Sequence, residues 1–464
     1  MNAINHPNLG NDLPVIVIGA GPVGLAAAAH LLARGIGVKL LEAGPDVGSH
    51  VRDWGHIRLF SPWSYNIDAA SRALLLKTGW QAPRRSQHPT GAELYTQYLK
   101  PLAETPEIAS VVEYDARVIA VSRLGFDKMK SSGRDLAPFT ILVRKPDGAE
   151  RIELARAVID CSGTWSQHNP IGTNGLPVPG EIAARDRIAY GTPDVLTDVR
   201  YANQRILVTG AGHSAANVLL DLVALRQRAP QTEIIWAVRG ASLARLFGGG
   251  ANDKLEARGA LGRSLENMVA GGQITVHMQS SIAHIETGEP LTVTLRRQHL
   301  DPMVIEVDRI IVATGQRPDL TMLREVRLDL DPATESPRIL APMIDPNVHS
   351  CGTVRPHGHR ELSQPDAGFY IAGIKSYGRA PTFLLATGYE QVRSIAAAIA
   401  GDLAAADDIQ LELPETGVCS TNLPVETSSC SSSSCSTQSE SPAVQVVSGC
   451  GTSKAKQTTT QGCC

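Results

Sequence analysis

The chain has few aromatic residues, no strong excess of charge and almost no cysteine before residue 419. Aromatic side chains make up 4% of its 464 residues, and 43 Lys and Arg face 46 Asp and Glu, for a formal net charge of −3. This balance offers no basic surface for nucleic acid. Six of the eight cysteines lie after residue 418, so the preceding part is not built on disulfides.

Long apolar runs and targeting patterns are also missing. No run reaches the ~18 apolar residues that a membrane-spanning helix requires. Residues 1–13 are polar and lack a signal-peptide pattern. We therefore expect a cytoplasmic protein that contacts neither a membrane nor nucleic acid. An apolar content of 43% supports a real core, and the length allows two or three domains.

What the sequence does contain is a strong dinucleotide-binding pattern near its start. Residues 15–18 read as a buried parallel strand, followed by the turn Gly19-Ala20-Gly21-Pro22-Val23-Gly24 and a helix over 25–33. The first glycine of such a turn allows the bend, the second admits a pyrophosphate, and the third brings the helix close to the sheet. The next strand, 37–41, ends in Glu42, whose carboxylate suits an adenosine ribose.

The pattern recurs in the middle of the chain. Residues 205–209 lead into Gly210-Ala211-Gly212-His213-Ser214-Ala215, and a strand over 234–238 ends in Arg239 instead of an acid. A cation at that position suits a 2′-phosphate, which favours NADPH over NADH. The alternative is that Arg239 is a solvated surface cation.

Three further buried strands end in small residues and glycine, at Cys161-Ser162-Gly163, Thr314-Gly315 and Gly373. Such ends let the backbone approach a ligand. We read Cys161 itself as a small buried hydrophobic residue. After Gly373 a helix is expected from about Pro381, with its N-terminus aimed at whatever binds beyond that glycine.

Four of the rare aromatic residues gather within twelve positions, at Trp54, Phe60, Trp63 and Tyr65, with Arg and His between them. Aromatic rings stack on planar heterocycles, and Arg can meet a phosphate or an anionic ring edge. The segment reads as a lid over the planar end of a cofactor. An ordinary aromatic cluster that seals a loop is the alternative.

Two other segments carry possible ligands. Residues 343–359 contain His349, Cys351, His357 and His359, which suits an active-site loop, a metal site or ordinary loop structure. From residue 414 the chain is rich in Ser, Thr and Cys and lacks aromatic residues. We expect a disordered tail whose thiolates bind thiophilic metals or metalloids, with a neutral low-complexity extension as the alternative.

These motifs resemble the two-dinucleotide-binding flavoproteins, and more narrowly the flavin-containing monooxygenase group. The resemblance covers roughly residues 13–400 and implies FAD on the first turn and NADPH on the second. Within the group, Trp54–Asn66 and His349–Arg360 resemble flavoproteins found near arsenic-resistance genes. The chain departs from the group at 187–193, which lacks the group's Gly-x-x-x-His element, and from related disulfide reductases, whose flavin-facing cysteine pair is missing before the tail.

The expected fold is α/β, with two Rossmann-like three-layer dinucleotide-binding domains, the NADPH domain inserted in the FAD domain, and a disordered Cys-rich tail. The predicted bounds are 13–197 and 309–402 for the FAD domain, 198–308 for the NADPH domain and 414–464 for the tail.

The expected function is an FAD-dependent NADPH oxidoreductase, foremost a monooxygenase that passes one oxygen atom from a flavin hydroperoxide to a small soft substrate or a metalloid. One alternative is an NADPH-dependent reductase of a thiol-bound metal or metalloid delivered by the cysteine tail. Another is a non-enzymatic thiophilic-metal binder or redox sensor. A homodimer is compatible with the sequence.

The candidate residues fall into three sets. Expected at the reaction site are Arg58, Trp63, His349, Cys351 and Tyr377. Expected at the cofactors are Gly19, Gly21, Pro22, Val23, Gly24, Glu42, Ala43, Trp54, Val118, Ser162, Gly163, Gly210, Gly212, His213, Ser214, Ala215, Arg239, Thr314, Gly315, Gly373 and Thr382. Expected metal ligands are Cys430, Cys435, Cys463 and Cys464.

Overall fold

A computed structural model describes residues 12–243, 256–347, 354–381 and 383–411. The predicted tail with its four cysteine ligands, and the candidate residues His349, Cys351 and Thr382, lie outside the described residues. Within those ranges, no helix combines the length and the apolar character needed to cross a bilayer.

The first sheet has five parallel strands in the order β16-β7-β1-β2-β3. Its central strand β1 is buried at all four positions, as expected for a parallel strand covered on both faces. The strands are β1 (Val15–Ile18), β2 (Val38–Leu41), β3 (Val112–Glu113), β7 (Ala157–Asp160) and β16 (Phe369–Ile371).

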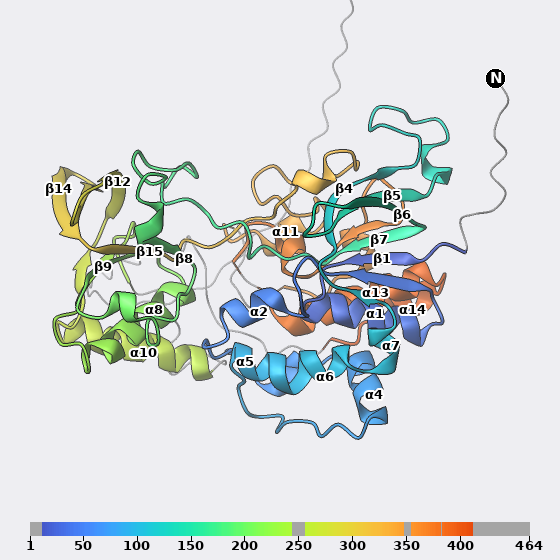
Figure 1. Cartoon of the computed structure of the whole chain (residues 1–464), viewed down its shortest axis with the longest axis horizontal. Helices are drawn as coiled ribbons and strands as arrows, with labels where there is room; N and C mark the ends of the chain where they lie inside the picture. The colour runs from blue at the N-terminus through green and yellow to red at the C-terminus, as the bar shows by residue number, and fades with distance from the viewer. Residues whose placement is uncertain (1–11, 244–255, 348–353, 382, 412–464) are drawn as a thin grey trace, which may run out of the picture. The chain divides into compact units, whose positions relative to one another are not determined.

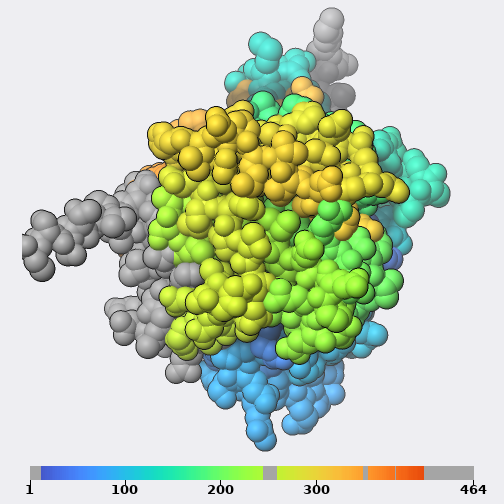
Figure 2. All heavy atoms as spheres, turned by 90° about the vertical axis from the view of Figure 1, so that its left-hand side faces the viewer, coloured from blue at the N-terminus to red at the C-terminus, as the bar shows by residue number. Residues whose placement is uncertain are grey.

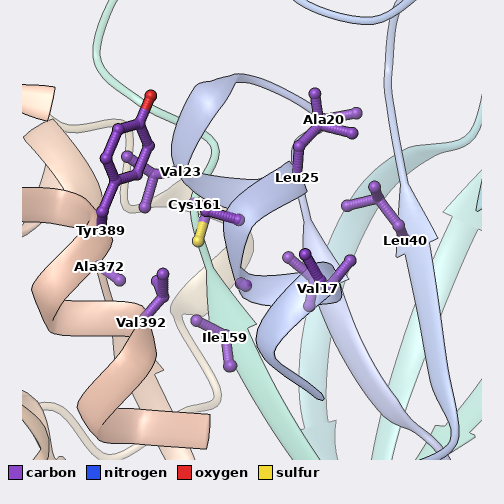
Figure 3. Close-up of a cluster of buried hydrophobic side chains, with 14 of the residues drawn as sticks. Val17, Ala20, Val23, Leu25, Leu40, Ile159, Cys161, Ala372, Tyr389 and Val392 are labelled. Carbon is purple, nitrogen blue, oxygen red and sulfur yellow. The ribbon is translucent and has the colours of Figure 1, made fainter. Parts of the chain in front are cut away.

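Alternate residues of β1 enter two different cores, which makes the unit three-layered. Val15 and Val17 join the core beneath the helices α1 (Pro22–Ala33) and α13 (Leu385–Ile399), where Figure 3 shows side chains of both helices meeting β1 and β7. Ile16 and Ile18 join the core beneath an antiparallel sheet. The strands of that sheet are β4 (Arg117–Arg123), β5 (Phe139–Arg144) and β6 (Glu150–Ala155).

The second sheet repeats this plan, with five parallel strands in the order β11-β10-β9-β15-β8. Figure 1 labels three of them, β8, β9 and β15. One face carries α8 (His213–Arg226) and α10 (Glu256–Ala270), and the other face carries the antiparallel sheet β12-β13-β14. Figure 2 shows these last three strands, in yellow, at the molecular surface. The strands are β8 (Ile188–Tyr190), β9 (Arg205–Thr209), β10 (Glu233–Ala237), β11 (Thr275–His277), β12 (Ser280–Glu286), β13 (Leu291–Arg297), β14 (Leu300–Val307) and β15 (Arg309–Val312).

The predicted insertion of one unit in the other is confirmed, because every strand of the second sheet lies between β7 and β16 in the chain. The expected return of the chain at residue 309 is wrong, since β15 pairs with β9, Val312 opposite Thr209. Strand β8, placed by sequence in 13–197, also pairs with β15. Both sheets use the same pattern of a buried strand ending in small residues, so the pattern cannot tell which sheet a strand joins.

Short helices connect these strands. The sequence predicts a helix over 90–103 that begins with a capping box, because Thr90 and Glu93 have the spacing of N-cap and N3 residues. The structure confirms it: Thr90 Oγ1 accepts from the Glu93 amide at 3.1 Å, and Glu93 Oε2 accepts from the Thr90 amide at 2.7 Å. Its middle, Tyr95–Leu99, is π-helical. The remaining helices of the described ranges are α2 (Ser49–Asp53), α3 (Trp63–Asn66), α4 (Ala69–Lys77), α5 (Gly91–Leu94), α6 (Lys100–Ala103), α7 (Pro106–Ala109), α11 (Ala341–Ile344), α12 (His359–Leu362) and α14 (Leu403–Asp407), with 3₁₀ turns at Arg134–Leu136, Arg185–Arg187, Val199–Tyr201, Thr321–Leu323 and Gly373–Tyr377.

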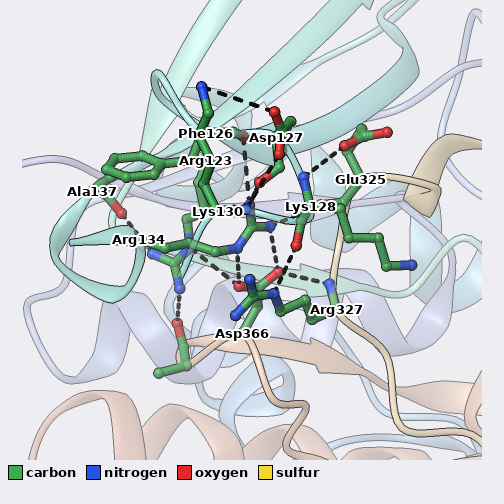
Figure 4. A network of polar contacts seen from close by, with 12 residues as sticks. Arg123, Phe126, Asp127, Lys128, Lys130, Arg134, Ala137, Glu325, Arg327 and Asp366 are labelled. Carbon is green, nitrogen blue, oxygen red and sulfur yellow. Dashed lines mark hydrogen bonds and ion pairs between the residues drawn. The ribbon is translucent and has the colours of Figure 1, made fainter. Parts of the chain in front are cut away.

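The segment 127–134 is anchored by a fully buried arginine, Arg134. Arg134 Nε and Nη2 each donate to a carboxylate oxygen of Asp366 at 2.8 Å, and the guanidinium also donates to the carbonyls of Asp127 and Glu325 (Figure 4). Arginine is rarely buried without a partner, and this partner lies 232 positions away in the chain. A pattern read along the sequence does not reveal such a pairing.

Candidate functional site

The first glycine turn separates what the fold requires from what a ligand would require. Gly19 has φ +95°, and a Cβ on Gly24 would lie 1.8 Å from the Gly19 carbonyl oxygen, so both positions need glycine for the fold itself. A Cβ on Gly21 would meet nothing within 4 Å. The fold therefore gives no reason for Gly21, whereas a phosphate approaching the backbone does.

The second turn shows the same division. Gly210 has φ +124°, and a Cβ there would lie 2.2 Å from the Ala313 carbonyl oxygen. A Cβ on Gly212 would meet nothing within 4 Å, and Ala215 is fully buried against the sheet. Two turns far apart in the chain thus leave the same middle position open.

Helices α1 and α8 begin directly at these turns, with Gly21 and Gly212 as their N-caps and no side-chain cap on either. The first-turn amides of a helix have no partner within the helix. Together with the positive end of the helix dipole they form an anion site. Both turns therefore fit the pyrophosphate of a dinucleotide.

Glu42 is buried beside the first turn, at 8% exposure. Its carboxylate accepts from the Ala20 amide at 2.7 Å and from the Gly44 amide at 2.8 Å. These bonds tie the end of β2 to the turn. A carboxylate offers about four lone-pair positions, so Glu42 retains capacity for the hydroxyls of a ribose, and Ala43 follows it on the chain.

Val23 brings the N-terminal turns of α1 and α13 together. A Cβ on Gly388 would lie 2.6 Å from Val23 Cγ2, and Gly373, with φ +71°, would place one 3.4 Å from Val23. Helix α13 begins at Leu385, after the predicted start at Pro381. Sequence reasoning singled out Gly373 and missed Gly388, whose need for glycine depends on a neighbour far along the chain.

An ion pair that sequence reasoning also missed lies at the ends of β7 and β16. Lys375 Nζ is 2.7 Å from Asp160 Oδ2, and the two residues are 1% and 0% exposed. The predicted cofactor residue Ser162 joins them, and Gly163 follows with φ +73°. The available signal was Asp160 itself, because an acid inside an apolar strand requires a buried partner.

Cys161 is buried in the core beneath α1 (Figure 3), which confirms its reading as a small hydrophobic residue. Burial, with a smaller contribution from Asp160, raises the pKa of its thiol well above the usual value. Cys161 therefore stays protonated at neutral pH.

Of the predicted reaction-site residues, Arg58 and Trp63 line the same pocket, whereas Tyr377 does not. Arg58 and Trp63 line a pocket of about 290 Å³ with Gln87, His88, Glu93 and Gln97. Tyr377 is 2% exposed and packs instead between the rings of His357 and Phe383. Burial raises the pKa of Tyr377, so its phenol stays neutral.

The sequence leaves two roles open for the aromatic segment from Trp54 to Tyr65, a lid over a cofactor or an ordinary cluster that seals a loop, and its residues differ in this respect. The Trp54 ring packs on Gly91, where a Cβ would lie 2.7 Å from it, and Trp63 is buried in the core. Phe60, by contrast, meets His213 of the second turn edge to face, with ring centroids 5.0 Å apart. The tryptophans thus form an ordinary cluster, and Phe60 is the aromatic residue that contacts a glycine turn.

The remaining candidates lie at several places. Val118 is buried between the first sheet and β4–β6, and Arg239 is exposed at the end of β10. The carbonyls of Thr314 and Gly315 accept hydrogen bonds from the side-chain and backbone N–H groups of Asn169 at 3.1 and 3.0 Å. These bonds join the two crossings between the sheets, namely the connection from β7 to β8 and the connection from β15 to β16. Ser214 is exposed beside His213 at the start of α8.

The histidines expected near residue 350 have separate partners. His357 contacts Gln391, whereas His359 contacts Asp407. Within the described ranges, no group of three or more His, Cys, Asp and Glu side chains is arranged to hold a metal ion.

Comparison with known proteins agrees with this geometry. Residues 14–114 match the family of FAD dependent oxidoreductases (DAO). The chain is 24% identical over 247 residues to the flavin-containing monooxygenase FMO GS-OX-like 2 of Arabidopsis thaliana, a match covering 47% of this chain and 49% of that protein. The chain thus spans about half the length of this curated relative.

Solved structures share the fold over most of the chain. Bacillithiol disulfide reductase Bdr (YpdA) from Bacillus cereus matches with a TM-score of 0.63 and 21% identity, over 84% of this chain and 99% of that one. DfoA, the cadaverine monooxygenase of Erwinia amylovora bound to FAD, matches with a TM-score of 0.60 and 13% identity, over 89% and 99%. The ornithine N-hydroxylase KtzI of Kutzneria sp. 744, with reduced FAD, NADP⁺ and L-ornithine, matches with a TM-score of 0.55 and 15% identity, over 84% and 99%.

Residues 14–114 therefore match the FAD dependent oxidoreductases, and the chain has the fold of the two-dinucleotide-binding flavoproteins. The predicted fold class is confirmed, and the predicted enzyme class, an FAD-dependent oxidoreductase, agrees with the family match over residues 14–114. The predicted cofactors, FAD and NADPH, agree with the FAD-dependent family and with neighbours of this fold.

Proposed function

We propose that the chain is an NADPH-dependent flavin monooxygenase, with FAD on the first glycine turn and NADPH on the second. The observation that carries the two cofactor sites is the pair of turns whose middle glycines, Gly21 and Gly212, have open space where a side chain would be. Bound FAD would supply the redox chemistry, accepting hydride from the nicotinamide without a protein acid or base.

The chain's own residues position the two cofactors. Glu42 would accept from the adenosine ribose of FAD while it holds the first turn through Ala20 and Gly44. The uncapped amides of α1 and α8 would bind the two pyrophosphates. Arg239, exposed beyond β10, would bind the 2′-phosphate of NADPH, a charge-assisted contact that NADH lacks.

Monooxygenation is favoured over disulfide reduction by the cysteine inventory of the described residues. The one cysteine among them is Cys161, a buried and protonated thiol with no second sulfur to pair with. The curated relative and two of the solved neighbours are monooxygenases or hydroxylases. A small soft substrate or a metalloid, entering beside Arg58 and Trp63, is the substrate class we propose.

A reductase is the second candidate, because the bacillithiol disulfide reductase of Bacillus cereus shares the fold with a TM-score of 0.63. In that case the tail cysteines, which lie outside the described residues, would deliver a thiol-bound metal or metalloid. A non-enzymatic metal binder or redox sensor would show metal binding without NADPH turnover.

Cofactor choice is tested with Arg239→Ala. Loss of an arginine–phosphate contact costs about 1.5–3 kcal/mol, which corresponds to roughly a 10- to 100-fold fall in kcat/KM for NADPH. Turnover with NADH is the internal control and should not change. An equal loss with both nucleotides would show that Arg239 does not read the 2′-phosphate.

The reaction type is tested by parallel oxygen and NADPH measurements on the purified full chain. A monooxygenase consumes one O₂ per NADPH and stops when oxygen is removed. A reductase continues anaerobically with a metal or metalloid acceptor, and truncation after Leu413 abolishes that activity. A protein that binds metal and oxidises no NADPH under either condition would overturn both enzymatic proposals.

A further inference from the structure

The ion pair between Asp160 and Lys375 satisfies the carboxylate but not the ammonium group. Asp160 Oδ2 accepts from Lys375 Nζ at 2.7 Å. Asp160 Oδ1 accepts from the amide of Ser162 at 3.0 Å and from its hydroxyl at 2.7 Å. Each carboxylate oxygen therefore accepts at least one hydrogen bond, and the turn after β7 is held against Lys375.

One of the three N–H donors of Lys375 has no acceptor among the described residues. An ammonium group has three N–H donors, and the second is 3.0 Å from Ser162 Oγ. For the third, the described residues provide no acceptor, although the side chain is only 1% exposed. Leaving a buried donor unpaired costs about 1–3 kcal/mol, so an acceptor from outside the chain would complete the site.

The order of the strands indicates which part of a bound dinucleotide would reach Lys375. Ligands of open α/β sheets bind beyond the carboxyl ends of the strands. In the order β16-β7-β1-β2-β3, Glu42 marks the adenosine end after β2, and the glycine turn marks the pyrophosphate after β1. A dinucleotide that continues in the same direction next passes the ends of β7 and β16. Adjacent strands lie about 4.8 Å apart, so these ends are within one or two strand spacings of the pyrophosphate.

We propose that Lys375, held in place by Asp160, donates its third N–H to the flavin half of FAD, between the pyrophosphate and the ring. This inference rests on the proposed placement of FAD on the first turn. It also assigns a reason for burying a charged pair at this edge, since apolar residues of similar volume would often be as stable. A fixed cation there favours the more negative, reduced form of FAD over the oxidised form.

The chain offers a matched control at the opposite end of the same strand. Arg134 and Asp366 form a second buried pair, both 0% exposed, with Nη2 and Oδ2 2.8 Å apart. Asp366 precedes β16, whereas Lys375 follows it. Because β16 is parallel to its neighbour β7, Asp366 lies at the amino edge of the sheet, away from the cofactor edge.

The test compares Lys375→Met, the double variant Asp160→Asn with Lys375→Met, and Arg134→Met, each as purified full chain. FAD dissociation constants are measured for the oxidised and reduced forms, together with the midpoint potential and the thermal unfolding temperature. We expect both Lys375 variants to bind oxidised FAD at least tenfold more weakly. Reduced FAD should lose a further tenfold, which corresponds to a midpoint potential about 30 mV lower for a two-electron couple.

These variants should show that stability and FAD binding change independently of each other. Arg134→Met should lower the unfolding temperature and leave both FAD dissociation constants unchanged. The double variant should recover stability relative to Lys375→Met, because no unpaired carboxylate remains, yet it should not recover FAD affinity. If Lys375→Met does not fold, the FAD dissociation constants of the double variant test the role of Lys375.

Two failures are distinguishable. A wild-type chain that binds no FAD would overturn the proposed function. A wild-type chain that binds FAD, with Lys375 variants whose dissociation constants and potential equal the wild-type values, would overturn the role of Lys375 and leave the proposed function standing.

Discussion

At the scale of single residues, substitutions of the second and third glycines of the first turn should have different effects. A Cβ on Gly24 would lie 1.8 Å from backbone oxygen, so Gly24→Ala should separate α1 from β1 and destabilise the fold by about 3 kcal/mol. Gly21 has φ −77° and open space around it, so Gly21→Ala should keep the wild-type stability and weaken FAD binding about tenfold. Urea unfolding and FAD titration measure the two effects.

Gly212→Ala is the matched control, because it is the equivalent open position of the second turn. It should weaken NADPH binding and leave the FAD dissociation constant unchanged. A Gly21→Ala variant that binds FAD as tightly as wild type would mean that nothing approaches the first turn.

The residues of the site were predictable to different degrees. The glycines and Glu42 could be predicted because their spacing follows from one local strand–turn–helix unit. Asp160, Lys375 and Gly388 could not, because each depends on a neighbour from another strand or helix. Such pairings depend on the packing of distant segments, and no local spacing expresses them.

At the scale of elements, a buried network holds α13 to the end of β16. Gln391 Oε1 accepts from the Gly373 amide at 2.8 Å, and Gln391 Nε2 donates to Ser376 Oγ and to His357 Nε2, each at 2.9 Å. His357 Nδ1 lies 2.9 Å from the Arg355 carbonyl oxygen and donates to it. The ring is therefore neutral in this arrangement, and burial lowers its pKa below 6.5.

This network should make folding sensitive to acid. Between the lowered pKa of His357 and 6.5, the unfolded chain binds more protons than the folded one, so stability rises with pH. The contribution is complete above pH 6.5 and is lost as pH falls through the folded-state pKa. His357→Gln keeps an acceptor without titrating, and it should reduce the stability lost between pH 7.5 and pH 5 by about 1 kcal/mol, measured by urea unfolding.

His284→Gln is the control for this variant, because His284 is exposed on β12. It should leave the acid sensitivity of the chain nearly unchanged. If His357→Gln loses as much stability as wild type between the two pH values, the acid sensitivity arises elsewhere, for example from carboxylates such as Asp366 whose pKa values are lowered by their partners.

Elements were predicted best where their signal is local. The capping box at Thr90 and both glycine-turn helices follow from short patterns and are confirmed. The sheet that β15 joins was predicted wrongly, because its strand pattern matches that of β7. Sheet membership depends on pairing partners, which a strand's own sequence does not state.

At the scale of the whole molecule, the described chain contains two sets of cores joined by two crossings. The first sheet supplies one pair of cores and the second sheet another. The crossings pair with each other, with the Arg317 amide donating to the Gln167 carbonyl at 3.0 Å. Each glycine turn belongs to one sheet, so each proposed cofactor should stabilise one set of cores.

Calorimetry should therefore show two unfolding transitions, because chains with separate cores depart from two-state behaviour. A ligand that binds only the folded state at 100 times its Kd stabilises that state by about 2.7 kcal/mol. FAD should raise the transition of the first unit and NADP⁺ that of the second, and Gly212→Ala should abolish only the NADP⁺ effect. A single transition that either ligand moves equally would instead mean that the crossings couple the two units into one cooperative structure, so that occupancy of either turn stabilises both.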